Sequence, residues 1–133
     1  MVIGSAAARL AGAAVTVADI DVLTSEGDAA RLLHRWASHR HHDHVPADSH
    51  RFRSLFARFN FSPLPVEIMG GLEFSCAERW ESVTIRHTML VDVDGIHVRI
   101  PTLDEQIRLL NNFGRPKDMA RAMALRSLHQ ERL

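Results

Sequence analysis

The first residues of the chain predict a short strand followed directly by a helix. Residues 1–3 are apolar, and a turn at Gly4 and Ser5 leads into a run of alanines, arginine and leucine. These residues favour helix, with Ser5 as the N-cap. Gly12 is expected to end this helix.

A second strand and a second helix follow. Residues 17–23 alternate apolar and acidic side chains, a pattern typical of a strand with one buried face. Ser25 is expected to cap a helix over residues 26–36. The apolar stripe of this helix consists of Ala29, Leu32, Leu33 and Trp36.

The middle of the chain has weaker patterns. Residues 37–50 are polar, rich in histidine and without periodicity, so a loop is expected. Apolar side chains then recur at helical spacing at Phe52, Leu55, Phe56 and Phe59. Pro63 and Pro65 favour an extended approach to a short strand over residues 66–70, closed by the glycine pair 70–71.

The C-terminal part has the clearest patterns. Residues 88–100 predict a hairpin with a two-residue turn at Asp94 and Gly95. Thr102 and Glu105 form a predicted capping box for the next helix, and Gly114 is its expected C-terminal stop. The buried face of that helix consists of Leu103, Ile107 and Leu110. A last helix starts at Pro116, with Met119, Met123 and Leu125 expected to point inward.

Composition limits the class of protein. A chain of 133 residues with 46% hydrophobic and 24% charged residues is expected to form one domain, residues 1–133. Sixteen basic and sixteen acidic residues give no reason to expect a membrane or an extended nucleic-acid partner. One cysteine, Cys76, excludes an internal disulfide and favours the cytoplasm. The apolar N-terminus lacks the basic start of a signal peptide.

Asp19 and Asp21 are the first candidate for chemistry. Side chains two apart in a strand point to the same face, so these carboxylates are expected to lie together while Ile20 and Val22 face the core. Paired carboxylates repel each other unless a cation lies between them. Oxygen ligands of this kind favour Mg²⁺.

Two further features extend this candidate site. A Gly-Ser turn at a helix start offers free backbone N–H groups, which favour a phosphate. Glu67 supplies a third acid on a strand that could pair beside the first. Three carboxylates and a phosphate site are the groups that two-metal phosphoryl or nucleotidyl transfer requires.

Four elements together resemble the nucleotidyltransferase superfamily with the DNA polymerase beta-like fold. They are the Gly-Ser helix start, the Asp-x-Asp strand, the acid in PVEIMG, and the stretch VDGIHVRIPTLDEQIRLLNNFGRPKDMARAMAL. In the last stretch a hairpin leads to a Leu-rich helix and an Arg-x-Lys-Asp motif at Arg115, Lys117 and Asp118. Small bacterial members have this arrangement, including minimal nucleotidyltransferases and the nucleotidyltransferase toxins of type IV toxin–antitoxin systems.

The resemblance implies a fold, a reaction and a set of residues. The fold is α/β (α+β), with helices on one face of a mixed sheet and a C-terminal helical pair. The reaction moves a nucleoside monophosphate from a nucleoside triphosphate to a hydroxyl of an RNA, a protein or a small molecule. The implied catalytic and Mg²⁺-binding residues are Asp19, Asp21 and Glu67, and the implied nucleotide-binding residues are Gly4, Ser5, Arg115 and Lys117. Some relatives have a toxin–antitoxin partner protein.

Other interpretations stay open. The chain has Leu110, Asn111 and Asn112 where many small relatives carry a lysine, which favours a weak or inactive binding or antitoxin-like module. The acids could face solvent, and the Arg-x-Lys-Asp residues could be ordinary charges in a first helical turn. A metal-responsive loop is the third hypothesis; its candidate ligands are His39, His41, His42, Asp43, His44, Asp48 and His50. Their spacing matches no closed structural site, so adventitious binding is the favoured interpretation of that loop.

Overall fold

The computed structural model describes residues 1–131, so the last two residues of the predicted domain lie outside it. The fold is α+β, as the resemblance implied. The chain divides into two compact units. Unit 1 consists of Met1–Val17 and Thr84–Leu133, and unit 2 is the intervening Ala18–Val83.

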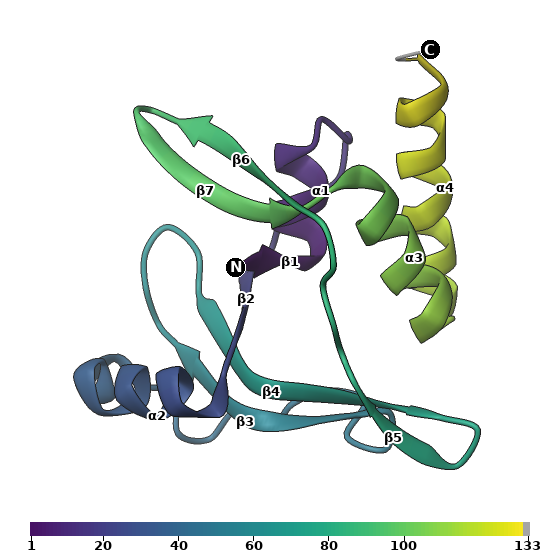
Figure 1. Ribbon diagram of the computed structural model, residues 1–133. Coiled ribbons are helices and arrows are strands. Elements are labelled where there is room, and N and C mark those ends of the chain that lie inside the picture. The colour runs from purple at the N-terminus through teal and green to yellow at the C-terminus, as the bar shows by residue number, and fades with distance from the viewer. Residues whose placement is uncertain (132–133) are drawn as a thin grey trace. The chain divides into compact units, whose positions relative to one another are not determined.

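Unit 2 is a mixed sheet with a helix on one face (Figure 1). Its elements are β2 (Ile20–Thr24), α2 (Glu26–Arg35), the short 3₁₀ helix η1 (Ala37–His39), β3 (Phe52–Phe59), β4 (Val66–Cys76) and β5 (Arg79–Ser82). β4 pairs in parallel with β2 and antiparallel with β3 and β5. Ser25 caps α2 as predicted, because its hydroxyl accepts a hydrogen bond from the Asp28 backbone N–H at 3.1 Å.

The core of unit 2 lies between α2 and the sheet. Its buried members are Ala29, Ala57, Phe59 and Ile68, with the predicted apolar stripe of α2 packed around them. Because side chains alternate along a strand, the other face of the sheet receives Phe56 and Arg58 from β3.

The helical spacing of the apolar residues around Phe56 does not correspond to a helix, because these residues form the strand β3. The pairing of β3 with β4 shifts between Arg53 and Leu55. An irregularity of this kind breaks the strict alternation of a strand, so apolar side chains on both faces imitate a helical period. Phe59 packs in the core beside α2, whereas Phe56 lies on the opposite face.

The short strand ending at the glycine pair was also wrong, since β4 continues to Cys76. The glycines are there for close packing. A Cβ atom on Gly70 would lie 2.5 Å from the Cβ of Ala29 in α2, closer than atoms can approach. Gly71 has φ +62°, a conformation that side chains disfavour.

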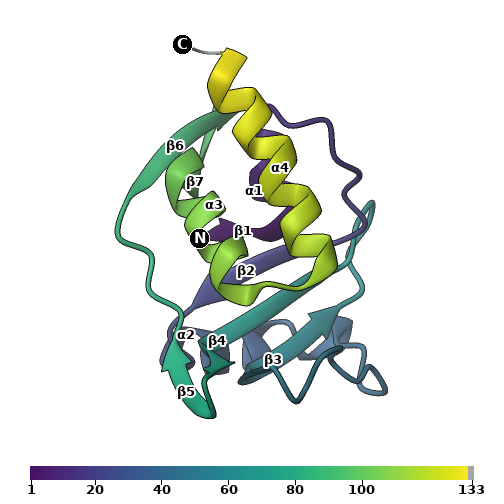
Figure 2. The ribbon, with the colours of Figure 1, turned by 90° about the vertical axis from the view of Figure 1, so that its right-hand side faces the viewer.

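Unit 1 combines a hairpin with three helices. Its elements are β1 (Val2–Ile3), α1 (Gly4–Leu10), β6 (Thr88–Val93), β7 (Ile96–Pro101), α3 (Leu103–Phe113) and α4 (Pro116–Glu131). Asp94 and Gly95 form the predicted turn, both with positive φ. The helices α3 and α4 lie side by side as the predicted C-terminal pair (Figure 2).

Two expectations about the helices of unit 1 were wrong. Ser5 does not cap α1, because the helix already starts at Gly4 and Ser5 is buried inside it. Met119 and Met123 do not point inward, since they are 39% and 66% exposed. Leu125 does point inward as expected, and it shares the inner face of α4 with Asp118 and Ala122, spaced four and three residues apart.

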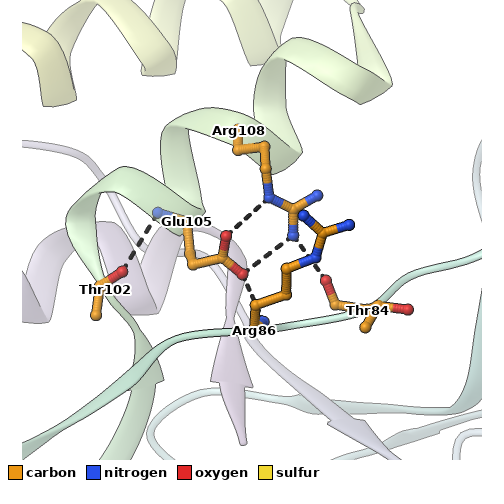
Figure 3. Close-up of polar contacts among 5 residues, drawn as sticks. All are labelled: Thr84, Arg86, Thr102, Glu105 and Arg108. Carbon is orange, nitrogen blue, oxygen red and sulfur yellow. Dashed lines mark hydrogen bonds and ion pairs between the residues drawn. The ribbon is translucent and has the colours of Figure 1, made fainter.

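Only one of the two hydrogen bonds of the predicted capping box of α3 forms, and the Glu105 side chain binds other partners instead (Figure 3). Thr102 accepts a hydrogen bond from the Glu105 backbone N–H at 3.4 Å. The buried Glu105 carboxylate binds the Arg108 guanidinium at 2.8 and 3.0 Å and the Arg86 backbone N–H at 2.6 Å. Arg108 also donates to the Thr84 carbonyl at 2.7 Å. This cluster fastens the segment 84–87 to α3.

Candidate metal centre

Asp19, Asp21 and Glu67 converge in unit 2. Each offers a carboxylate oxygen, and the three oxygens lie within 4.8 Å of one another. The register explains the meeting: Asp21 on β2 is paired directly with Glu67 on β4. The acidic strand starts later than predicted, at Ile20 rather than at residue 17, so Asp19 lies just before β2.

Alternation along the strands fixes the face on which these acids lie. Val22 on β2 and Ile68 on β4 pack in the core beside α2. Their neighbours Asp21 and Glu67 therefore point to the opposite face. All three acids are half-buried, so they are reachable from solvent but partly desolvated.

Arg58 is the member of the site that the sequence did not predict. It lies on β3, paired with Glu67 across the strands. One guanidinium nitrogen, Nη1, lies 2.8 Å from Glu67 Oε1 and 3.3 Å from Asp19 Oδ2. The row Asp21, Glu67 and Arg58 thus crosses three adjacent strands. The sequence did not reveal Arg58 because the apolar residues around Phe56 have helical spacing. Assigning this stretch to a strand would have placed Arg58 on the same face as the acids.

The electrostatics of the cluster show that negative charge is in excess. Partial burial, a hydrogen bond with Asp19 and the charges of Asp21 and Asp19 raise the pKa of Glu67 to about 7. Arg58 acts in the opposite direction on this pKa, but one guanidinium does not offset three carboxylates. Hard, partly desolvated carboxylate oxygens are the donors that Mg²⁺ and Mn²⁺ prefer, so the residues present fit a divalent cation.

The histidine-rich loop is attached to the strand that carries Arg58. The His41 backbone N–H donates to the Arg58 carbonyl, and the Asn60 N–H donates to the His39 carbonyl, both at 2.8 Å. The His44 ring stacks on Phe56 at 5.8 Å. The pKa of His44 is lowered, first by partial burial and then by the positive charges of Arg58 and His41. The negative charge of Asp19 acts in the opposite direction. Among the residues that the structure describes, the acidic trio is the group of three or more candidate ligands that converges; the histidines form no such group.

The predicted nucleotide-binding residues lie in unit 1. Gly4 and Ser5 start α1, and Gly4 has φ +68°. Arg115 makes a two-pronged ion pair with the fully buried Asp118, at 2.6 and 3.0 Å. Lys117 is exposed in the first turn of α4. Their role in binding nucleotide stays a prediction.

Comparison with known proteins bears on the fold. Protein-family models and curated protein sequences gave no match. The structure is similar to the crystal structure of a "putative nucleotidyltransferase" from Thermotoga maritima, with a TM-score of 0.74. The alignment covers 98% of this chain and 81% of that chain at 24% sequence identity. This is a nucleotidyltransferase-like fold. The fold that the resemblance implied is therefore confirmed.

Among residues 1–131, no helix has the length and apolar character needed to cross a membrane.

Proposed function

We propose that this chain is a Mg²⁺-dependent nucleotidyltransferase that moves a nucleoside monophosphate from a nucleoside triphosphate to a hydroxyl acceptor. The observation that carries the proposal is the meeting of Asp19, Asp21 and Glu67 within 4.8 Å. The nucleotidyltransferase-like fold is consistent with it. A fold alone does not determine function, so the proposal rests on the site.

The proposed roles follow from the positions of the carboxylates. Asp19 and Asp21 would hold the Mg²⁺ that accompanies the triphosphate, and with Glu67 they would hold a second, catalytic Mg²⁺. Two ions held there would stabilise the negative charge that develops on the attacking and leaving oxygens. The acceptor oxygen bonds to the α-phosphorus, the bond to the bridging oxygen breaks, and pyrophosphate leaves. Glu67 assists by accepting the proton of the acceptor hydroxyl.

The nucleotide-binding roles of Gly4, Ser5, Arg115 and Lys117 rest on the sequence resemblance alone. The acceptor is an RNA, a protein or a small molecule; a net charge of zero disfavours a long nucleic-acid footprint. We also keep the predicted cytoplasmic location, the single nucleotidyltransferase-like domain and a toxin–antitoxin partner as expectations.

Label transfer tests the proposal. Each α-labelled nucleoside triphosphate is incubated with the protein, Mg²⁺ and a cell extract, in parallel with Asp21→Asn and Glu67→Gln. Transfer should fall by at least about a hundredfold in both variants, since removing a charged transition-state contact costs roughly that factor. Asp28→Asn, an exposed acid on α2, is the matched control and should retain transfer.

Two results would contradict this function. Label transfer that persists in Asp21→Asn would show that the reaction does not depend on the acidic cluster. Triphosphate binding with no transfer to any acceptor would favour the non-catalytic binding or antitoxin-like module.

A further inference from the structure

Arg58 lies between two of the carboxylates that would hold a cation. Its Nη1 contacts Glu67 at 2.8 Å and Asp19 at 3.3 Å, two of the three candidate ligands. The contacts are partly desolvated, with the Arg58 side chain 21% exposed. A guanidinium is a permanent cation, so it balances part of the negative charge in the metal-free protein.

A divalent cation and this guanidinium compete for the same carboxylates. Carboxylate oxygens bound to Mg²⁺ lie about 2.1 Å from the ion. An ion held by Asp19 and Glu67 at that distance repels a positive group in contact with both carboxylates. Arg58 must therefore withdraw from at least one of them when the ion binds.

The strand pairing limits how far Arg58 can withdraw. Its backbone is paired with Glu67 through the β3–β4 register, so only the side chain is free to turn. A displaced guanidinium stays near the cluster, where the phosphates of a metal-bound triphosphate are the new source of negative charge. Guanidinium and phosphate match in geometry and form two parallel hydrogen bonds.

We propose that Arg58 is an exchangeable cation of this site: it bridges Asp19 and Glu67 before the metal binds, and then turns to bind a phosphate of the triphosphate. This inference rests on the proposed function. It assigns the site a phosphate-binding cation within unit 2 itself.

The same pair of strands provides a matched control. Arg53 on β3 pairs with Glu73 on β4 at 2.9 Å, and its guanidinium also lies over the Trp80 ring at 4.4 Å. This pair is more exposed and touches none of the three candidate ligands. Arg53→Gln thus removes the same charge from the same strand without altering the acidic cluster.

Metal binding without nucleotide tests the first half of the proposal. Free Mn²⁺ is measured by electron paramagnetic resonance during titration of the wild type, Arg58→Gln and Arg53→Gln. Loss of a competing cation should tighten Mn²⁺ binding about tenfold in Arg58→Gln and leave Arg53→Gln unchanged. Unchanged or weaker binding in Arg58→Gln would overturn the proposal, because an arginine that only holds the acids in place gives that result.

Binding of magnesium tripolyphosphate tests the second half, and this probe needs no knowledge of the base. Titration calorimetry at saturating Mg²⁺ should show about tenfold weaker binding to Arg58→Gln, but not to Arg53→Gln. Arg58→Lys keeps the charge without the paired hydrogen bonds, so it should bind Mn²⁺ like the wild type and tripolyphosphate more weakly. Equal tripolyphosphate affinity in wild type and Arg58→Lys would overturn the phosphate role. This comparison remains valid if Arg58→Gln does not fold.

The proposed function fails in a different way. In that case the wild type binds no Mn²⁺ at the cluster, and Asp21→Asn changes nothing in either titration. If Asp21→Asn abolishes Mn²⁺ binding but Arg58→Gln does not tighten it, only the proposed role of Arg58 is contradicted.

Discussion

Glu67 shows how a single residue of the site weakens the fold. Its carboxylate is partly buried beside two other acids, and these surroundings raise its pKa to about 7. Folding therefore favours the protonated form. As pH rises from about 4.5 through 7, the folded chain must ionise Glu67 against its neighbours, so stability is lost across that range.

Glu67→Gln should stabilise the metal-free protein at pH 8. The amide removes the repulsion but also the ion pair with Arg58, so the expected gain is about 1–2 kcal/mol rather than the full value of the pKa shift. Urea unfolding in chelator at pH 5 and pH 8 measures it, and the gain should shrink at pH 5. Glu73→Gln, in the exposed pair with Arg53, should change stability by no more than about 0.5 kcal/mol. A destabilised Glu67→Gln at pH 8 would show that Arg58 outweighs the repulsion.

At the scale of elements, the packing of α2 on β4 depends on one missing side chain. Gly70→Ala places a Cβ 2.5 Å from the Ala29 Cβ, and the nearest other atoms are backbone atoms of Ser25 and Glu26 at the start of α2. The helix and strand must move apart, which costs about 1–3 kcal/mol.

Thermal unfolding of Gly70→Ala and Gly27→Ala compares a crowded position with an open one. Gly27 lies in α2 with nothing within 4 Å of the added Cβ, so alanine should stabilise the helix by up to about 1 kcal/mol. Equal melting temperatures for the two variants would contradict the close packing of β4 on α2.

The cluster around Glu105 fastens a segment to α3 in a pH-dependent way. The Arg108 hydrogen bonds, with help from the Arg86 and His87 backbone N–H groups, lower the pKa of Glu105 to about 2 against the effect of burial. An acid with a lowered pKa contributes stability that is complete above its unfolded value, about 4.5, and is lost as pH falls towards 2.

Glu105→Gln should therefore lower stability at pH 7 by about 2–3 kcal/mol and flatten the acid limb between pH 4.5 and 2. Circular dichroism at fixed urea concentration across that range follows both effects. Asp104→Asn, the neighbouring exposed acid, is the control. An acid limb of unchanged slope in Glu105→Gln would show that this carboxylate does not bind as described.

The sequence predicted elements with local signals and failed where contacts decide. Ser25 and the Asp94–Gly95 turn were predictable, because caps and tight turns are made by neighbouring residues. The strand β3 was missed because its irregular pairing places apolar residues on both faces. In the site, the spacing of Asp19 and Asp21 was enough to predict that they lie together. Arg58 joins them only through the β3–β4 register, which pairs it with Glu67, 9 residues further along the chain. No local pattern contains that information.

At the scale of the whole chain, the acidic cluster and the stability of the fold are linked. An ion that binds only the folded chain stabilises it by an amount that grows with its concentration, about 2.7 kcal/mol at a hundred times the dissociation constant. Mn²⁺ should therefore raise the melting temperature of the wild type at pH 8. The rise should disappear in Asp21→Asn but persist in His44→Gln, which leaves the trio intact. A rise that depends on His44 instead would assign the ion to the histidine-rich loop.

The most direct test of the metal centre is the position of the ion itself. Anomalous diffraction from crystals grown with Mn²⁺ and a non-hydrolysable triphosphate locates it without reference to activity. We predict anomalous density about 2.1–2.2 Å from carboxylate oxygens of Asp19, Asp21 and Glu67, with Arg58 turned away from Glu67. Mn²⁺ bound only at the histidine-rich loop, with Arg58 still bridging Asp19 and Glu67, would contradict it.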